Sequence, residues 1–333
     1  MGGSANPPQR PQEALQMHVS PELRAAWTQL WTTGDLDSLP QQRAAGLLAP
    51  LESTWRRFFS SFEDGARLLD LATGGGEVLR AALAVGRNFH LTGVDIADLS
   101  AVSASFQTCK IELIGSTDLA SLPLPDCWFD GVASQFGIEY ADVEVATREA
   151  VRVLANNGRG HLVLHHRHSV ITQGVINNLA AEHSVFSDGD TFQVGRQFFE
   201  LKACSAPTEA IMAAEAAFRH SVAVLRSRIR NEPAFGMARN VVGFLSRLAE
   251  VPDSLPPAEA LHRLDFVKRD TQARRLRKQA QLDSSLDKEG VGRLSTALTN
   301  AGAVVDPARE LKYRDGHLMA WELSFCKRAG RAQ

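Results

Sequence analysis

The chain has 333 residues, of which 44% are hydrophobic and 22% charged, enough for one large globular domain or two small ones. Its formal net charge of -2 gives no overall attraction to nucleic acid or to an anionic membrane. No apolar run approaches the roughly 20 residues of a membrane-spanning helix, and none of the four cysteines lies in a CxxC pair. These features predict a cytoplasmic protein with no membrane span, no disulfide framework and no metal site.

The N-terminal part divides into two segments. Residues 1–19 are rich in glycine and proline and are interpreted as a flexible tail. Residues 20–62 are expected to be helical, because Ser20-Pro21-Glu22 has the form of a helix start. The tryptophans of this segment are either ordinary core packing or part of a lid over a ligand site.

The segment 63–169 alternates short apolar runs with helical patterns, which is typical of a parallel sheet covered by helices. Strands are expected at 67–71, 89–94, 110–114, 129–134 and 161–166, and helices at 77–85 and 142–155. A turn is expected at Asn156-Asn157-Gly158, just before the fifth strand.

The rest of the chain changes character twice. Residues 170–284 are interpreted as a helical insertion that caps the substrate, and residues 285–333 as the C-terminal part of the core. That last part contains a helix at 286–300 and strands at 303–305 and 317–326. The predicted fold is therefore α/β, with a Rossmann-like, seven-stranded, mostly parallel sheet, helices on both faces, a helical insertion and N-terminal helices.

A glycine-rich loop, Asp70–Glu77, joins the first strand to the first helix of the core. Gly74, Gly75 and Gly76 allow the backbone to approach a ligand closely, although a tight turn without a ligand would also use them. Asp95 ends the second strand, where a carboxylate can accept hydrogen bonds from both hydroxyls of a ribose. Together these features predict a nucleoside cofactor at the carboxyl edge of the sheet.

The loop favours S-adenosylmethionine over NAD. A dinucleotide site needs a third glycine where this chain has Leu79. The acidic Asp70 would also repel a pyrophosphate, whereas it suits a cofactor with a cationic amino-acid end. An NAD-dependent oxidoreductase is thus a disfavoured alternative.

Three motifs resemble the class I S-adenosylmethionine-dependent methyltransferases, especially those similar to ubiquinone/menaquinone-biosynthesis methyltransferases. They are Asp70 with Gly74-x-Gly76, the acidic Asp95, and the segment Asp118–Asp130 that leads into the fourth strand. The resemblance covers about Trp55 to Arg167 and the C-terminal helix and strands, roughly half of the chain. It departs from the family at Ala72, where glycine is usual.

This resemblance implies a set of residues that bind S-adenosylmethionine and its product S-adenosylhomocysteine. The loop would hold the methionine part, Asp95 the ribose, Ile96 and the Asp118 region the adenine, and the end of the fourth strand would lie beside the sulfonium. The implied cofactor-binding residues are Asp70, Ala72, Thr73, Gly74, Gly75, Gly76, Asp95, Ile96, Asp118, Leu119, Ser134, Gln135 and Phe136.

The acceptor side carries fewer signals. His165 and His166 end the fifth strand and are candidates for a catalytic base or for substrate orientation, as is the nearby His168. Hydrogen-bonded or exposed turn residues, or a metal site, are the alternatives. Glu139 and Tyr140 are candidate substrate-binding residues, with ordinary loop packing as the alternative.

The insertion contains basic clusters, among them Arg226–Arg230 and Lys268–Lys278. They indicate either an anionic or RNA substrate or a solvated helix face balanced by nearby acids. A small-molecule acceptor is the preferred hypothesis, with nucleic acid disfavoured. A cofactor-binding but non-catalytic partner and an RNA or protein methyltransferase are the alternatives. The oligomeric state is open, a homodimer being one option.

Overall fold

The computed structural model describes residues 19–32, 48–106, 111–186, 190–230, 236–313 and 315–328. The expected tail, 1–19, lies outside the described residues except for Val19, and so does segment 33–47 of the expected lid.

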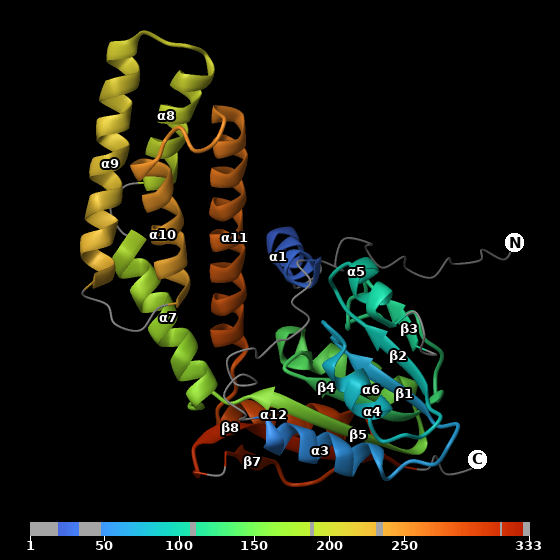
Figure 1. Cartoon of the computed structure of the whole chain (residues 1–333). Helices are drawn as coiled ribbons and strands as arrows, with labels where there is room; N and C mark the ends of the chain where they lie inside the picture. Colours follow the sequence, from blue (N-terminus) through green and yellow to red (C-terminus); the bar gives the residue numbers. More distant parts are fainter. Residues whose placement is uncertain are drawn as a thin grey trace, which may run out of the picture.

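A twisted sheet forms the centre of the molecule (Figure 1). Its strand order is β3-β2-β1-β4-β5-β8-β6, with β7 paired to β8. Strands β1 to β5 are parallel to their neighbours, and β8 runs antiparallel to β5, β6 and β7. The predicted Rossmann-like, mostly parallel sheet is confirmed. The strands are β1 (Arg67–Leu71), β2 (His90–Val94), β3 (Ile111–Ile114), β4 (Phe129–Gln135), β5 (Leu154–His165), β6 (Ala303–Val305), β7 (Arg309–Lys312) and β8 (Leu318–Lys327).

The sheet differs from the prediction at two places. It has eight strands among the described residues instead of seven, because β7, with the sequence Arg-Glu-Leu-Lys, pairs with β8 without an apolar pattern. Strand β5 also begins at Leu154, so the turn expected at Asn156-Asn157-Gly158 is absent. These residues lie in a shift of the β4–β5 register instead, with Asn157 at a positive φ of 62°.

Helices cover both faces of the sheet. Side-chain alternation along β1 sends Leu68 to one face and Leu69 and Leu71 to the other. The Leu68 face packs against α3 (Ala49–Phe59), α4 (Glu77–Leu83) and the short α5 (Ser100–Ser103); the Leu69 face packs against α6 (Val143–Val153) and α12 (Lys288–Asn300). Asp142 caps α6 by accepting hydrogen bonds from the N–H groups of Glu144 and Val145.

Five helices follow β5 and form a tower that stands away from the sheet (Figure 1). They are α7 (Val170–Phe186), α8 (Thr191–Ala203), α9 (Thr208–Arg230), α10 (Gly236–Glu250) and α11 (Pro257–Ser284). The tower has its own apolar core, which includes Phe198, Phe199 and Phe218. Its two ends meet at the sheet, because the Leu286 N–H donates to His165 O and the Arg167 N–H donates to Leu286 O. The chain therefore leaves and re-enters the core at one point.

Helix α1 (Pro21–Thr32) lies between the sheet and the tower. The Asp98 N–H donates to Thr28 Oγ1 over 3.1 Å, which ties α1 to the loop after β2. On its other side, Gln29 Nε2 donates to Asp270 Oδ1 of α11 over 3.2 Å. Across the parts of the chain that the structure describes, no helix has the length and apolar character needed to cross a membrane.

Candidate active site

A cavity of about 500 Å³ opens at the carboxyl ends of β1, β2, β4 and β5. Parallel α/β sheets bind ligands at this edge, and the volume is in the range of small-molecule sites. Helix α1 and the sheet-proximal ends of α7 and α11 close it. The predicted site residues that line it are Asp70, Ala72, Thr73, Gly74, Gly75, Asp95, Ile96, Asp118, Leu119, Gln135, Phe136, Tyr140 and His165.

The glycine loop is shaped by left-handed backbone conformations. Gly74 and Gly76 have φ values of 51° and 81°, which favour glycine. A Cβ on Gly74 would lie 2.6 Å from the ring of Trp31, so the loop and α1 are in direct contact only because this side chain is missing. Gly76 itself lies outside the cavity lining and ends the loop as the N-cap of α4. Ala72 also has a positive φ, 54°, which is strained for a residue with a Cβ.

Asp95 is buried and fastens the loop. Its Oδ2 accepts a hydrogen bond from the Gly74 N–H and its Oδ1 from the Ala97 N–H, both over 2.8 Å. Burial raises the pKa of Asp95, and these two backbone donors oppose the rise. The carboxylate thus joins the loop after β1 to the loop after β2, at the cavity wall.

Asp70 differs from Asp95 in accepting no backbone hydrogen bond among the described residues. Both of its carboxylate oxygens are buried, and the residue is 1% exposed. Burial raises its pKa to about 8; the hydroxyl of the neighbouring Thr73 opposes the rise, and the negative charges of Asp95 and Glu77 add to it. An unpaired buried carboxylate in a cavity wall is costly unless a ligand supplies donors or positive charge.

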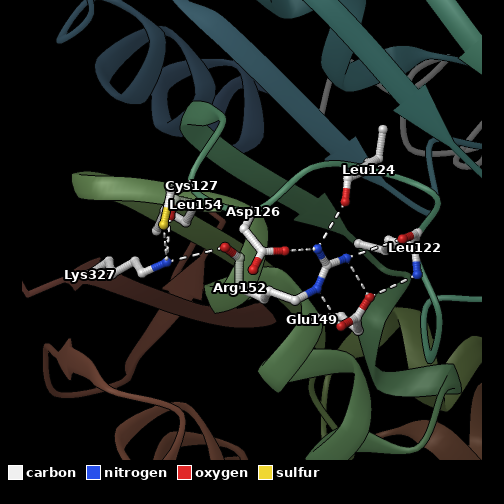
Figure 2. A network of polar contacts seen from close by, with 8 residues as sticks. All are labelled: Leu122, Leu124, Asp126, Cys127, Glu149, Arg152, Leu154 and Lys327. Atoms are coloured by element: carbon white, nitrogen blue, oxygen red, sulfur yellow. Dashed lines mark hydrogen bonds and ion pairs between the residues drawn. The ribbon is translucent and has the colours of Figure 1, made fainter. Parts of the chain in front are cut away.

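Asp118 and Leu119 line the cavity from the segment that connects β3 to β4. Asp118 Oδ1 accepts a hydrogen bond from the Ala120 N–H over 2.9 Å, which fixes the turn. The remainder of this segment is clamped by Arg152 of α6. Figure 2 shows its guanidinium between the carbonyls of Leu122 and Leu124 and the carboxylates of Asp126 and Glu149.

Two further contacts complete this clamp. Glu149 Oε2 accepts a hydrogen bond from the Leu122 N–H over 2.8 Å. The Arg152–Glu149 ion pair therefore binds both the N–H and the carbonyl of Leu122. Lys327 of β8 donates to the carbonyls of Arg152 and Leu154 on the far side (Figure 2). Neither Arg152 nor Lys327 was marked by the sequence motifs.

The end of β4 contributes one structural and two lining residues. Ser134 lies behind the cavity, where its hydroxyl donates to Leu71 O over 2.9 Å and accepts from the Ile138 N–H. Gln135 bridges two elements, since its Oε1 accepts from Trp55 Nε1 and its Nε2 donates to Glu77 Oε2. Phe136 stacks on His165, with the ring centroids 4.3 Å apart.

The two candidate histidines, His165 at the end of β5 and His166 directly after it, face opposite sides of the sheet. His165 lines the cavity, and burial lowers its pKa to about 3, so its ring is neutral at physiological pH. His166 lies outside the cavity, contrary to the expectation that both would face the acceptor. It stacks on Trp321 at 4.4 Å and accepts a hydrogen bond from the His168 N–H. Successive strand residues alternate in direction, which explains the difference.

The other histidine-based alternative, a metal site, finds no support in the described part of the chain. His168 is exposed, and no group of three or more His, Cys, Asp or Glu side chains there could hold a metal ion.

Glu139 and Tyr140 occupy different places. Tyr140 lines the cavity and meets Trp27 of α1 edge-on, with ring centroids 5.6 Å apart. Glu139 lies behind the lining, where its Oε1 accepts a hydrogen bond from the His165 backbone N–H over 2.8 Å. Burial raises the pKa of Glu139 to about 7. Its role in the structure is to hold the end of β5.

One wall of the cavity comes from helix α11, which the sequence motifs did not assign to the site. Arg274, Arg277, Lys278 and Gln281 recur at helical spacing and line the cavity together. They belong to one of the basic clusters for which an anionic substrate and a solvated face were both considered. Their helical spacing indicated in the sequence that they share one face of a helix. The packing of α11 showed that this face lines the cavity.

Residues 69–162 match the family model described as a methyltransferase domain. No curated protein matches the sequence. Among solved structures, a putative methyltransferase from Haloferax volcanii in complex with a methyltransferase activator is 22% identical, with a TM-score of 0.37; the overlap covers 42% of this chain and 60% of that one. A Mesorhizobium loti S-adenosylmethionine-dependent methyltransferase is 25% identical, with a TM-score of 0.30, 34% of this chain and 52% of that one being covered.

A third structure overlaps almost completely but at low identity. The Burkholderia thailandensis 1,6-didemethyltoxoflavin-N1-methyltransferase, solved with bound 1,6-didemethyltoxoflavin and S-adenosylhomocysteine, is 11% identical, with a TM-score of 0.46. The overlap covers 98% of this chain and 93% of that one. The overlaps with the Haloferax and Mesorhizobium proteins extend over less than two thirds of those chains.

Proposed function

We propose that this chain, whose residues 69–162 carry a class I S-adenosylmethionine-dependent methyltransferase domain, transfers a methyl group to a small-molecule acceptor. The observation that carries the proposal is that three separate motifs, at Asp70–Gly75, Asp95 and Asp118–Leu119, meet in one cavity of about 500 Å³. A cavity covered by α1 favours a small acceptor over a nucleic acid, which would need an open surface.

The donor end of the cavity fits S-adenosylmethionine. The buried Asp70 carboxylate has no cationic partner and no backbone donor in the described chain, so an ammonium group in the cavity would satisfy it. Asp95 stands at the end of β2, where its remaining lone pairs can accept from ribose hydroxyls. Leu119 and Ile96 offer apolar contact for the adenine, and the Asp118 carboxylate an acceptor for its amino group.

When bound, S-adenosylmethionine supplies an activated methyl group on its sulfonium, so the chain itself needs to provide mainly position and shelter from water. Helix α1 provides the shelter through Trp27 and Trp31. Phe136 and Tyr140 form an aromatic wall around His165 on the other side. Since the His165 ring is neutral and its pKa is low, we propose that it orients the acceptor by a hydrogen bond.

The proposal is tested by calorimetric titration of the full chain with S-adenosylmethionine and with S-adenosylhomocysteine. We expect both to bind, and the Asp95→Ala variant to bind at least tenfold more weakly, about 1.4 kcal/mol. The matched control is Asp98→Ala, an exposed carboxylate three residues away that caps only its own turn. Absence of binding by both compounds would overturn the cofactor assignment, and an unchanged dissociation constant in Asp95→Ala would overturn the role of Asp95.

The acceptor is then sought with labelled S-adenosylmethionine and a cell extract. A labelled metabolite supports the proposed reaction, whereas label found only in protein or RNA contradicts the small-molecule acceptor.

A further inference from the structure

The acceptor end of the cavity contains a buried positive charge that the methyl-donor chemistry does not use. Arg277 of α11 is 8% exposed and lines the cavity. Its guanidinium donates to the Ala26 carbonyl of α1 and lies 6.0 Å from the ring of Trp27. Within the described ranges, no carboxylate forms an ion pair with it.

The neighbouring cations of the same helix face do have carboxylate partners. Arg274 pairs with Asp270 over 2.8 Å, and Lys278 pairs with the buried Glu182. Both lie one turn or less from Arg277, so the carboxylates nearest to it, Asp270 and Glu182, are already engaged by other cations. Burial lowers the pKa of Arg277 to about 10, and the charge of Arg274 adds to the lowering, which still leaves it protonated at neutral pH.

Apart from the cations of α11, this end of the cavity is uncharged and largely aromatic. Tyr140, His165 and Trp27 line it together with Val170 and Ile171 of α7. The acidic lining residues, Asp70, Glu77, Asp95 and Asp118, belong instead to the loops at the donor end. The cavity is therefore polarised, with a negative donor end and a positive acceptor end.

Building on the proposed function, we propose that the acceptor is a small planar or aromatic anion whose carboxylate is bound by Arg277. A carboxylate would supply the counter-charge that the buried guanidinium lacks and would accept from its remaining N–H groups. The aromatic side chains around it would hold the ring of the acceptor between α1 and β5. A neutral analogue would leave Arg277 unpaired, and such a loss is the basis of strong discrimination.

The test uses two matched pairs of probes, benzoate with benzamide and indole-3-acetate with indole-3-acetamide. Each is titrated by calorimetry into the full chain saturated with S-adenosylhomocysteine. We expect at least one carboxylate to bind 10-fold or more tightly than its amide, and Arg277→Met to abolish that preference while the affinity for S-adenosylhomocysteine changes less than twofold. Arg277→Lys, which keeps the charge, should retain part of the preference.

The matched control is Arg275→Met, which removes an exposed arginine of α11 outside the cavity lining and should leave the preference intact. Equal affinity for acid and amide, no binding by any probe, or a preference that survives Arg277→Met would each overturn the inference. A chain that fails to bind S-adenosylhomocysteine would instead contradict the proposed function, so the two failures are distinguishable. Circular dichroism of both methionine variants separates either result from misfolding.

Discussion

The two ends of the cavity are built in different ways. The donor end consists of loops that follow β1, β2 and β3, and its residues lie within about fifty positions of one another, from Asp70 to Leu119. The acceptor end is assembled from segments far apart in the sequence, such as Trp27 of α1, His165 of β5 and Arg277 of α11. The donor end thus depends on backbone geometry, and the acceptor end on how separate elements pack.

The difference extends to the charges. Within the described residues, a buried carboxylate at the donor end and a buried guanidinium at the acceptor end each lack an ion-pair partner. Both arrangements cost folding stability unless a ligand of opposite charge is bound. We infer that the cavity selects its ligands through these two groups, which attract a cation at the donor end and an anion at the acceptor end.

The strongest prediction distinguishes His165, the last residue of β5, from His166, which follows it. His165→Ala should lower kcat about 100-fold, or about 2.7 kcal/mol, because its ring lies at the acceptor end of the cavity. His166→Ala should leave kcat unchanged and lower the melting temperature, because its ring packs on Trp321 instead.

The measurement is the rate of methyl transfer to the acceptor identified from extract, with thermal unfolding in parallel. Since the pKa of His165 is lowered to about 3, the rate should also show no titration between pH 5 and pH 8 from this group. Equal kcat losses in the two variants would contradict the assignment of the His165 and His166 side chains to opposite faces of the sheet.

Asp70 offers a test of the donor end through pH. Its carboxyl group ionises near 3.8 in the unfolded chain and near 8 in the folded chain, so the folded state holds the extra proton between these values. The stability of the unliganded protein should therefore fall as pH rises from about 4 to about 8. Asp70→Asn should remove this fall, making the variant more stable at pH 8.5 by on the order of 5 kcal/mol and equal to wild type near pH 4.

Chemical denaturation of both proteins at pH 4.5 and pH 8.5 gives the comparison. The same variant should bind S-adenosylhomocysteine at least tenfold more weakly, since it loses the charge that faces the ammonium. A stability difference that is the same at both pH values would show that the Asp70 carboxyl is not strained by burial.

The clamp at Arg152 supports the donor end from outside the cavity. Arg152→Ala should destabilise the fold by about 1.5 kcal/mol, because it frees the carbonyls of Leu122 and Leu124 and leaves Glu149 unpaired. Cleavage within 118–130 in limited proteolysis should become faster. Arg148→Ala, an exposed position on the same helix, is the control and should change neither property. If both variants behave alike, the network in Figure 2 does not stabilise the segment 118–130.

The smallest expected effect concerns Ala72. Its φ of 54° is strained for alanine, so Ala72→Gly should raise the free energy of unfolding by about 1 kcal/mol. Ala81→Gly, in the interior of α4, should have the opposite sign by a similar amount. Thermal unfolding measures both, and destabilisation by Ala72→Gly would show that the methyl group packs favourably against Gly137.

Much of the fold could be predicted from the chain because its signals are local. Apolar runs of strand length alternating with helical patterns identified all of β1 to β6 and β8 as elements. Strand β7 could not be found this way, since an edge strand with the sequence Arg-Glu-Leu-Lys is held by backbone hydrogen bonds to β8 and not by an apolar face. The start of β5 was missed because asparagine and glycine are typical both of a turn between two elements and of a bulge within a strand.

At the site, local motifs were enough to predict which residues come together at the donor end. A glycine loop after one strand and a carboxylate after the next must meet at the edge of a parallel sheet, so Asp70, Gly74 and Asp95 could be brought together without coordinates. The residues of the acceptor end could not be predicted in this way, because they come together only when distant elements pack. Whether His165 or His166 faces the cavity, and whether Arg277 faces water or a ligand, depends on how β5 and α11 pack against the sheet and α1. Residues more than a hundred positions apart have no spacing rule, so their meeting is set by packing alone.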